Sequence, residues 1–313
     1  MTEPVIGTVD GQRVLVYELT VTNYGNTAYN LTGLRLRDER GNELRDWSME
    51  ELYASYLHKR VAGRLPPGAA QTLLLWVPLS DQSQPGELRH QFTFGEDQVD
   101  SQPLKIRPLT LPQLSLPFSL AGRWVAANGP SNGSGHRGTI LGLQGIPYLS
   151  QRWAIDWMIK DDQDRTYRGD PLDKRSYFCY GADVLAVAQA TVIAVQDDIP
   201  ENVPGANSRA VPMDLETLGG NCVNLDLGGG CYARYAHLIP GSIQVKVGDR
   251  VHRGQVLGKI GNSGNSGEPH LHFHVADQPP WLPSQGLPYL LQRYRLARPG
   301  LEAEIHVGDL PGE

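Results

Sequence analysis

Apolar and polar side chains alternate over short stretches of the N-terminal third of the chain, which predicts strands. Residues 14–25 alternate and end at Asn-Tyr-Gly, and residues 31–44 read as a strand, an Arg-Gly-Asn turn and a return strand. A Pro-Pro-Gly turn precedes residues 71–79, a strand with apolar side chains on both faces. A short helix is predicted within residues 45–63, because apolar residues there recur near helical spacing.

Short strands separated by regular turn signals predict an immunoglobulin-like β-sandwich over residues 1–101. Prolines then recur every four or five residues between residues 102 and 119. Such a segment cannot form a helix and is stiff and extended, so it is predicted to be an interdomain linker. Residues 120–313 again contain short strands without a long amphipathic helix. They are predicted to form a second all-β domain.

The most informative stretch is residues 261–275, where a turn rich in Gly, Asn and Ser precedes three histidines that alternate with apolar residues. The histidines are His270, His272 and His274. Side chains two residues apart on a strand point to the same face, so the three imidazoles would line one face. Neutral imidazoles are suited to zinc binding and to proton transfer. The alternative interpretation is a solvated strand face that happens to carry histidines.

Residues 231–275 resemble the core strands of the M23 (LytM/lysostaphin-type) metallopeptidases. Four features carry the resemblance: the Tyr-x-His that ends at His237, the VKVGDRV…GQ turn, the Gly-Asn-Ser-Gly, and the His-x-His within PHLHF. The resemblance extends over roughly residues 120–295. It implies a small antiparallel β-sheet peptidase domain with one zinc ion per chain. It also implies cleavage of bacterial peptidoglycan peptides, or of similar peptides rich in glycine or containing D-amino acids.

The resemblance also implies roles for individual residues. In the family, an H-x-x-x-D motif supplies one His and one Asp ligand, and the second His of H-x-H supplies the third ligand. Asp156 occupies the Asp position of this chain, and His272 occupies the third-ligand position. His270 and His237 correspond to the pair that polarises the water and stabilises the tetrahedral intermediate. The alternative interpretations are a surface or capping carboxylate for Asp156 and a packed core histidine for His237.

The chain departs from the family pattern at Arg152, which stands where the H-x-x-x-D motif has its histidine. Arginine is permanently cationic and cannot ligate zinc. His136, in a loop rich in Gly, Asn and Ser, is the first candidate for the missing ligand, and His274 is the second. The alternative for His136 is an exposed loop histidine. Arg152 is instead expected to pair with a carboxylate or with bound substrate.

Further substrate contacts are expected from His274 and from Asn262, whose main expected role is to shape the turn before the histidine strand. The remaining histidines lack partner spacing and are predicted to be surface or structural residues; they are His58, His90, His252 and His306. Neither G-x-S-x-G nor H-E-x-x-H occurs, so serine-hydrolase and zincin interpretations have no support.

Bulk properties narrow the function further. With 40% hydrophobic and 20% charged residues, the 313-residue chain is predicted to be a soluble globular protein. The net charge of −6 gives no electrostatic case for binding nucleic acid. The chain contains no apolar run of about 18 residues, so no transmembrane span is predicted. The resemblance implies the cell envelope, periplasmic or secreted, although no leader pattern is present and a cytoplasmic location stays open.

The three cysteines are too few for a disulfide framework, and their spacing does not suit a zinc site; they are Cys179, Cys222 and Cys231. Whether Cys222 and Cys231 approach each other is left open, as is the oligomeric state. A second hypothesis, motivated by Arg152, is a degenerate LytM-like module that binds cell wall or activates another hydrolase. A third is a surface-binding protein that acts through its N-terminal sandwich.

Overall fold

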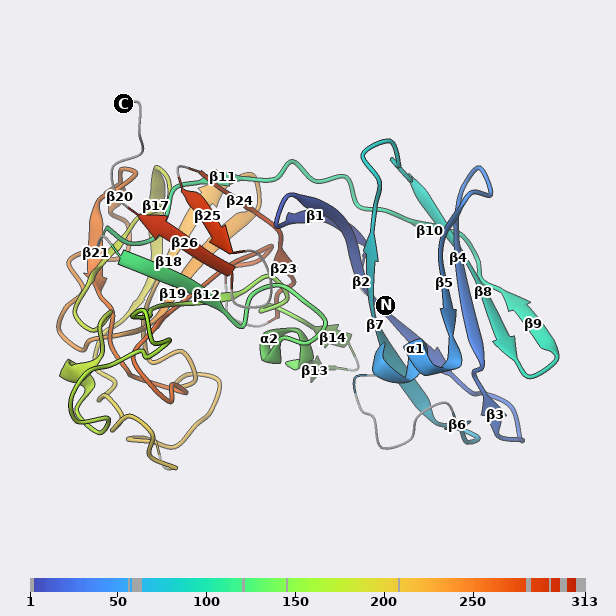
Figure 1. Ribbon diagram of the computed structural model, residues 1–313, viewed down its shortest axis with the longest axis horizontal. Coiled ribbons are helices and arrows are strands. Elements are labelled where there is room, and N and C mark those ends of the chain that lie inside the picture. Colours follow the sequence, from blue (N-terminus) through green and yellow to red (C-terminus); the bar gives the residue numbers. More distant parts are fainter. Residues whose placement is uncertain are drawn as a thin grey trace. The chain divides into compact units, whose positions relative to one another are not determined.

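The computed structural model describes residues 3–55, 57, 64–119, 122–144, 146–207, 209–279, 283–292, 294–298 and 303–307. The chain divides into two compact units, Met1–Leu111 and Pro112–Glu313. Figure 1 shows that strands are the main regular secondary structure of both, so the all-β prediction is confirmed. Among the described residues, no helix has the length and apolarity required to span a membrane.

The first unit is a sandwich of two antiparallel sheets. One sheet has the strand order β1 (Val5–Val9), β2 (Gln12–Thr22), β7 (Ala70–Pro78). The other has the order β10 (Leu104–Lys105), β8 (Glu87–Phe94), β4 (Gly33–Asp38), β5 (Glu43–Ser48), and β9 (Asp97–Asp100) also pairs with β8. A short pair joins β3 (Tyr29–Asn30) to β6 (Arg64–Leu65).

Alternation in these strands creates the core of the first unit. Every second residue of β2 and of β7 points inward, so Leu15, Tyr17, Leu73 and Leu75 are buried together with Leu36 of β4. The predicted short helix is confirmed as α1 (Met49–Ser55), whose Leu52 joins the same core. Of the remaining residues of the predicted range, 45–48 belong to β5, and residues 56 and 58–63 lie outside the described residues. The two-sheet sandwich is shown, and its immunoglobulin-like character stays a prediction.

The segment from residue 102 to residue 119 contributes a strand to each unit. Its first part contains β10, which pairs with β8 in the first unit. Its second part contains β11 (Gln113–Leu114), which pairs in parallel with β24 (Leu290–Leu291) in the second unit.

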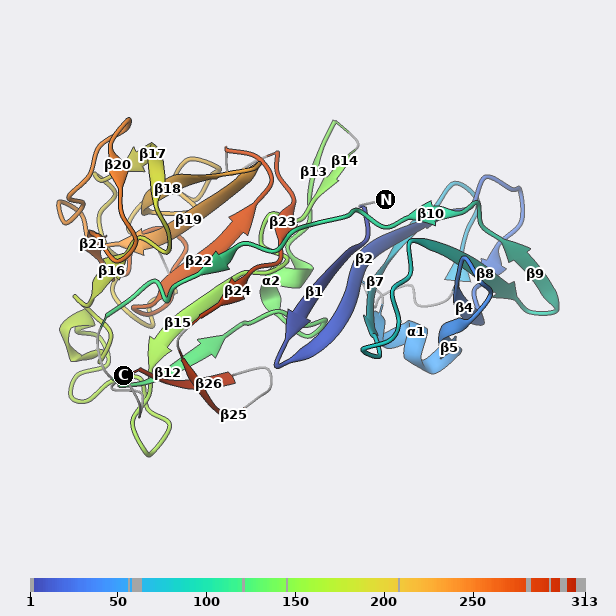
Figure 2. The same ribbon diagram turned by 90° about the horizontal axis from the view of Figure 1, so that it is seen from above.

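The second unit is built on one large antiparallel sheet, seen from above in Figure 2. Its strand order is β20 (Arg250–Val251), β17 (Ala190–Gln196), β18 (Asn221–Gly228), β19 (Cys231–Leu238), β22 (Leu271–Ala276), β15 (Ile155–Ile159), β12 (Gly122–Ala127), β26 (Ala303–Val307), β25 (Arg295–Arg298). β23 (Gly286–Leu287) also pairs with β22. The smaller elements are β13 (Leu141–Leu143) with β14 (Ile146–Tyr148), β16 (Asp183–Leu185) with β21 (Val256–Lys259), helix α2 (Gly135–Gly138) and the 3-10 helix η2 (Lys174–Ser176).

The two central strands of this sheet, β15 and β22, are buried along their whole length. Leu271, Phe273 and Val275 are fully buried, and the Phe273 ring lies 5.1 Å from the Tyr235 ring of β19, centroid to centroid. Because side chains alternate along a strand, the two histidines of β22, His272 and His274, share the opposite face with His270, which lies just before the strand. The predicted arrangement of the histidine strand is therefore present.

The cysteines do not form a framework. Cys222 lies near the start of β18 and pairs with Gln196, whereas Cys231 starts β19 and pairs with Gly228 at the opposite end of the hairpin. The two therefore do not approach each other. Cys179 is buried, which raises the pKa of its thiol to about 12, and its Sγ donates a hydrogen bond to the Pro269 carbonyl.

Candidate metal centre

The candidate site begins with a cross-strand pair. β15 and β22 run antiparallel, and their register places Asp156 directly opposite His272. The Oδ1 atom of Asp156 lies 2.9 Å from the Nδ1 atom of His272. Both residues are buried, with exposed fractions of 6% and 3%. The sheet register therefore fixes one carboxylate and one imidazole at contact distance.

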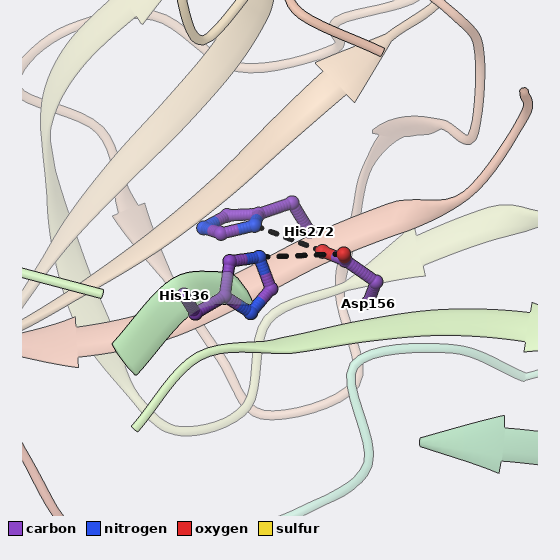
Figure 3. Close-up of side chains that lie close together, drawn as sticks. All are labelled: His136, Asp156 and His272. Carbon is purple, nitrogen blue, oxygen red and sulfur yellow. Dashed lines mark hydrogen bonds and ion pairs between the residues drawn. The ribbon is translucent and has the colours of Figure 1, made fainter. Parts of the chain in front are cut away.

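His136 approaches the same carboxylate from helix α2. Its Nε2 atom lies 3.3 Å from Asp156 Oδ2, and its side chain is only 12% exposed. Figure 3 shows the three side chains of His136, Asp156 and His272 converging from three separate segments. The alternative interpretation of His136 as an exposed loop histidine does not fit this position.

These three residues form a donor set suited to zinc. One ligand atom from each, two imidazole nitrogens and one carboxylate oxygen, lies within 4.8 Å of the others. A tetrahedral zinc ion with bonds of about 2.0–2.1 Å requires donors about 3.3 Å apart. The distances of 3.3 Å and 2.9 Å between donor atoms and Asp156 oxygens are close to this spacing. The residues present therefore fit a zinc ion.

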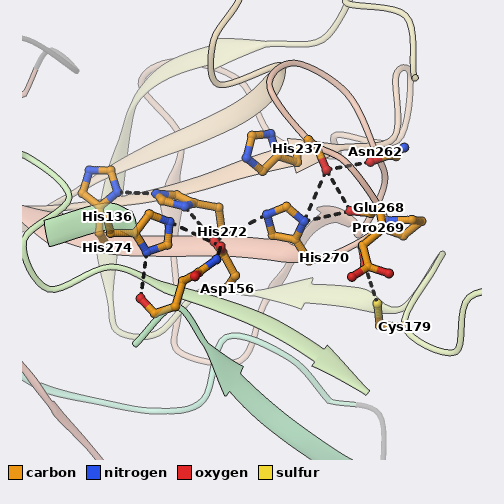
Figure 4. A network of polar contacts seen from close by, with 12 residues as sticks. His136, Asp156, Cys179, His237, Asn262, Glu268, Pro269, His270, His272 and His274 are labelled. Carbon is orange, nitrogen blue, oxygen red and sulfur yellow. Dashed lines mark hydrogen bonds and ion pairs between the residues drawn. The ribbon is translucent and has the colours of Figure 1, made fainter. Parts of the chain in front are cut away.

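Two further histidines border this group. The Nε2 atom of His270 lies 3.4 Å from Asp156 Oδ1, and the ring of His237 lies 4.8 Å from that of His270, centroid to centroid. His270 Nδ1 donates to the Glu268 carbonyl at 2.8 Å, and His237 Nδ1 donates to the Ser263 carbonyl at 2.8 Å. With Nδ1–H engaged in this way, Nε2 of each ring carries the lone pair in the neutral tautomer. Figure 4 shows both rings beside Asp156 and His272.

The backbone at His237 has a φ of +67°, a left-handed conformation that is uncommon for a side-chain-bearing residue. It comes at the end of β19, whose Ala236 pairs with His272. The adjacent Gly-rich turn holds the His237 ring, because Ser263 in that turn supplies the carbonyl that accepts from its Nδ1.

The electrostatics favour neutral rings at His272, His237 and His274 and an ionised carboxylate at Asp156. Burial lowers the pKa of His272 to about 4 although its hydrogen bond to Asp156 acts in the opposite direction, and burial also lowers the pKa of His237 and of His274. Burial opposes ionisation of Asp156, but the neighbouring histidines outweigh it and hold the pKa of that carboxyl well below its usual value. For His270, burial is outweighed by Asp156, which raises the pKa. Neutral imidazole and ionised carboxylate are the forms that bind metal.

Two other predicted site residues, His274 and Asn262, are buried near this centre. His274 is 2% exposed, and its Nδ1 lies 2.9 Å from Nε2 of His272, so it stands behind His272 and not beside Asp156. Asn262 has no exposed surface, and Ser266 Oγ donates to its Oδ1 at 2.6 Å. This burial places Asn262 in the support of the turn, as expected, and leaves its side chain no surface with which to touch a substrate.

Arg152 is also buried, at 2% exposure. Its guanidinium donates to Gln285 Oε1 at 3.3 Å. Burial lowers its pKa to about 10, and the nearby Asp277 carboxylate acts in the opposite direction. The predicted pairing of Arg152 with a carboxylate or with bound substrate stays a prediction. Of the other histidines, His90 is buried and His252 is exposed, while the His58 position and the side chain of His306 lie outside the described residues.

Asn128 is a site residue that the sequence analysis did not single out. Its side-chain amide donates to Asp156 Oδ2 at 2.8 Å, and its carbonyl accepts from His136 Nδ1 at 2.9 Å. The Asn-Gly pair that it begins is a turn signal, but a turn signal does not indicate which distant side chains the turn will contact.

Comparisons with known proteins agree with the predicted resemblance. Residues 177–281 match the model of peptidase family M23. The match includes His237 and the histidine strand, whereas His136 and Asp156 lie upstream of it. A search of curated proteins found no match.

Several solved structures resemble the chain at low similarity. A mutant catalytic domain of the prophage-encoded M23 protein EnpA from Enterococcus faecalis is 20% identical, covers 57% of this chain and 93% of its own, and has a TM-score of 0.32. The catalytic domain of the antimicrobial peptidase lysostaphin from Staphylococcus simulans is 20% identical, with coverages of 53% and 88% and a TM-score of 0.28. A complex of SpoIIIAH and SpoIIQ is 18% identical, covers 56% of this chain and 96% of its own, and has a TM-score of 0.34. These scores are too low to carry an argument about function.

Proposed function

Because residues 177–281 carry an M23 peptidase domain, we propose that this protein is a zinc-dependent peptidase whose metal is held by His136, Asp156 and His272. The observation that carries the proposal is the convergence of these three side chains on one point. Three protein ligands leave a fourth position of a tetrahedral zinc ion open, which is typical of catalytic and not of structural sites. His136 would thus take the role of the histidine that Arg152 replaces.

When bound, zinc would supply a Lewis acid that polarises a carbonyl and lowers the pKa of a water molecule. The remaining chemistry falls to His270 and His237. Each has its Nδ1–H held by a backbone carbonyl, so its Nε2 can accept a proton. After accepting one, the same Nε2–H becomes a donor that can stabilise negative charge on the carbonyl oxygen under attack. His270 is the better placed of the two, because its Nε2 is already 3.4 Å from Asp156.

The proposed substrates are the peptides of bacterial peptidoglycan, or similar peptides that are rich in glycine or contain D-amino acids. The family match supports this substrate class, and it also supports a place in the cell envelope, periplasmic or secreted.

The direct test is the zinc content of the purified full-length protein in metal-buffered solution. Wild type is expected to hold one zinc ion per chain, and His136→Ala is expected to lose it. His252→Ala is the matched control, since His252 is an exposed histidine outside the cluster, and it should retain zinc. Retention of zinc by His136→Ala would overturn the ligand assignment.

A second candidate function is a non-catalytic module that binds cell wall or activates another hydrolase. The observation in its favour is Arg152, a buried arginine in the position of a usual ligand. The same measurement separates the two proposals, because a wild-type protein that binds no zinc and cleaves no peptidoglycan would support the non-catalytic module.

A further inference from the structure

The turn after β12 brings one asparagine against two of the three residues proposed to bind zinc. β12 ends at Ala127, which pairs with Asp156 in the neighbouring strand β15. Asn128 follows with a φ of +50°, in the left-handed region that asparagine tolerates better than most residues. This conformation ends the strand, and the side-chain amide and the backbone carbonyl of Asn128 then contact different side chains.

The side chain of Asn128 holds Asp156. Its Nδ2 atom lies 2.8 Å from Asp156 Oδ2. An ionised carboxylate has no hydrogen to donate, so the amide nitrogen and not the amide oxygen must face it. This hydrogen bond restricts rotation of the Asp156 carboxylate, whose other oxygen lies beside His272.

The backbone carbonyl of Asn128 holds His136. It accepts hydrogen bonds from His136 Nδ1 at 2.9 Å and from Ser134 Oγ at 2.7 Å. The contact places the proton of the neutral His136 ring on Nδ1 and leaves the lone pair on Nε2, the atom 3.3 Å from Asp156. His136 belongs to a helix of only four residues, Gly135–Gly138, which by itself restrains a side chain weakly.

We propose that Asn128 is the positioning residue that makes a loop histidine, His136, usable in place of the ligand lost at Arg152. One residue fixes the tautomer of His136 through its carbonyl and the orientation of Asp156 through its amide. The inference rests on the proposed function, because it assigns Asn128 a role toward the same metal. It predicts that zinc binding by His136 depends on the backbone conformation of residue 128.

Two substitutions separate the two contacts. Asn128→Gly keeps the left-handed backbone and the carbonyl but removes the amide, so only the contact to Asp156 is lost. Asn128→Val removes the amide and also disfavours the left-handed backbone, so the carbonyl contact to His136 is lost as well. Gln144→Gly is the matched control, because Gln144 is an exposed residue with a φ of +52° outside the cluster.

The experiment is the zinc dissociation constant of each full-length variant, measured by chelator competition, with the Co²⁺ absorption spectrum as a second readout of ligand geometry. Asn128→Gly should bind zinc about 10-fold more weakly than wild type, and Asn128→Val should approach a 100-fold loss, the range typical of residues that orient metal ligands. The Val variant should also show an altered Co²⁺ spectrum, while Gln144→Gly should match wild type. Thermal unfolding of the metal-free proteins shows whether each variant is folded.

The outcomes distinguish this inference from the proposed function. Zinc binding in wild type with unchanged affinity in folded Asn128→Gly would overturn the role of Asn128 and leave the peptidase proposal standing. No zinc binding in wild type would overturn the proposed metal site itself. If Asn128→Val does not fold, Asn128→Gly still decides the role of the amide, because glycine adopts the left-handed backbone without strain.

Discussion

His274 lies directly behind His272, with its Nδ1 atom 2.9 Å from the Nε2 atom of His272. The exposed fractions of the two residues are 2% and 3%. Binding of zinc by Nδ1 of His272 would place the ring proton on Nε2, which then donates to His274 Nδ1. His274, which the sequence offered as a second candidate ligand, is thus placed to orient the His272 ring.

Removing this support should weaken metal binding without removing a ligand. His274→Ala is expected to raise the zinc dissociation constant by about 10- to 100-fold, since it leaves the Nε2–H of His272 without its acceptor. His274→Glu restores an acceptor, and its charge would lie near the buried Arg234, whose positive charge already acts on His274. The Glu variant should recover most of the affinity in chelator competition. Equal affinities in wild type and His274→Ala would contradict the orienting role.

His270 should be required for turnover but not for metal binding. His270→Ala is expected to retain zinc and to cleave peptidoglycan peptides at least about 100-fold more slowly, the loss typical for a general base. Zinc content and the initial rate of peptide release should be measured on the same preparation. Undiminished cleavage in this variant would show that His270 does not move the proton.

The turn before the histidine strand depends on glycine at position 264. Gly264 has a φ of +72°, and a Cβ atom there would lie 2.2 Å from the backbone nitrogen of Gly220. Gly264→Ala should therefore push apart the two loops that hold His237. The Gly219 carbonyl of one loop accepts from the backbone N–H of His237, and the Ser263 carbonyl of the other accepts from its Nδ1. We expect a loss of at least about 2 kcal/mol in the free energy of unfolding, measured by urea titration.

Gly267→Ala is the control for this prediction. It lies in the same turn, but a Cβ atom there meets nothing within 4 Å. A similar loss of stability in both variants would mean that the turn is sensitive to any added methyl group and not to the close approach of Gly264 to Gly220.

The first unit should lose stability in mild acid through His90. Its Nε2 accepts a hydrogen bond from the Tyr17 hydroxyl at 2.8 Å, and burial lowers its pKa to about 4 from the usual 6.5. Between these values the unfolded chain binds a proton that the folded chain does not, so stability falls as the pH drops from 6.5 towards 4. The full effect is about 3 kcal/mol.

The measurement is urea unfolding followed by NMR signals of β2 and β8, at pH 7 and at pH 4.5. Wild type should lose about 2 kcal/mol more than His90→Gln over this interval, because glutamine does not titrate. Equal losses in the two proteins would show that His90 makes no contribution to the acid sensitivity of the first unit.

The sequence by itself determined the features that depend on short-range geometry. The alternation of His270, His272 and His274 with apolar residues was enough to place three imidazoles on one strand face, because side chains two apart on a strand must share a side. Helical spacing located α1, and the pattern from Tyr235 onward indicated the resemblance to peptidase family M23, which the match over residues 177–281 confirms. The H-x-x-x-D motif of the family placed Arg152 at a ligand position, and the permanent charge of arginine excluded it as a zinc ligand.

Only the tertiary structure decided which histidine lies beside Asp156 and His272. His136 reaches them because β12 pairs with β15, a left-handed residue ends β12, and the following loop returns its helix to the carboxylate. His274 was equally available by spacing, yet its ring faces the far side of His272. Such choices depend on strand register and burial between segments distant in sequence, and local periodicity carries no information about either.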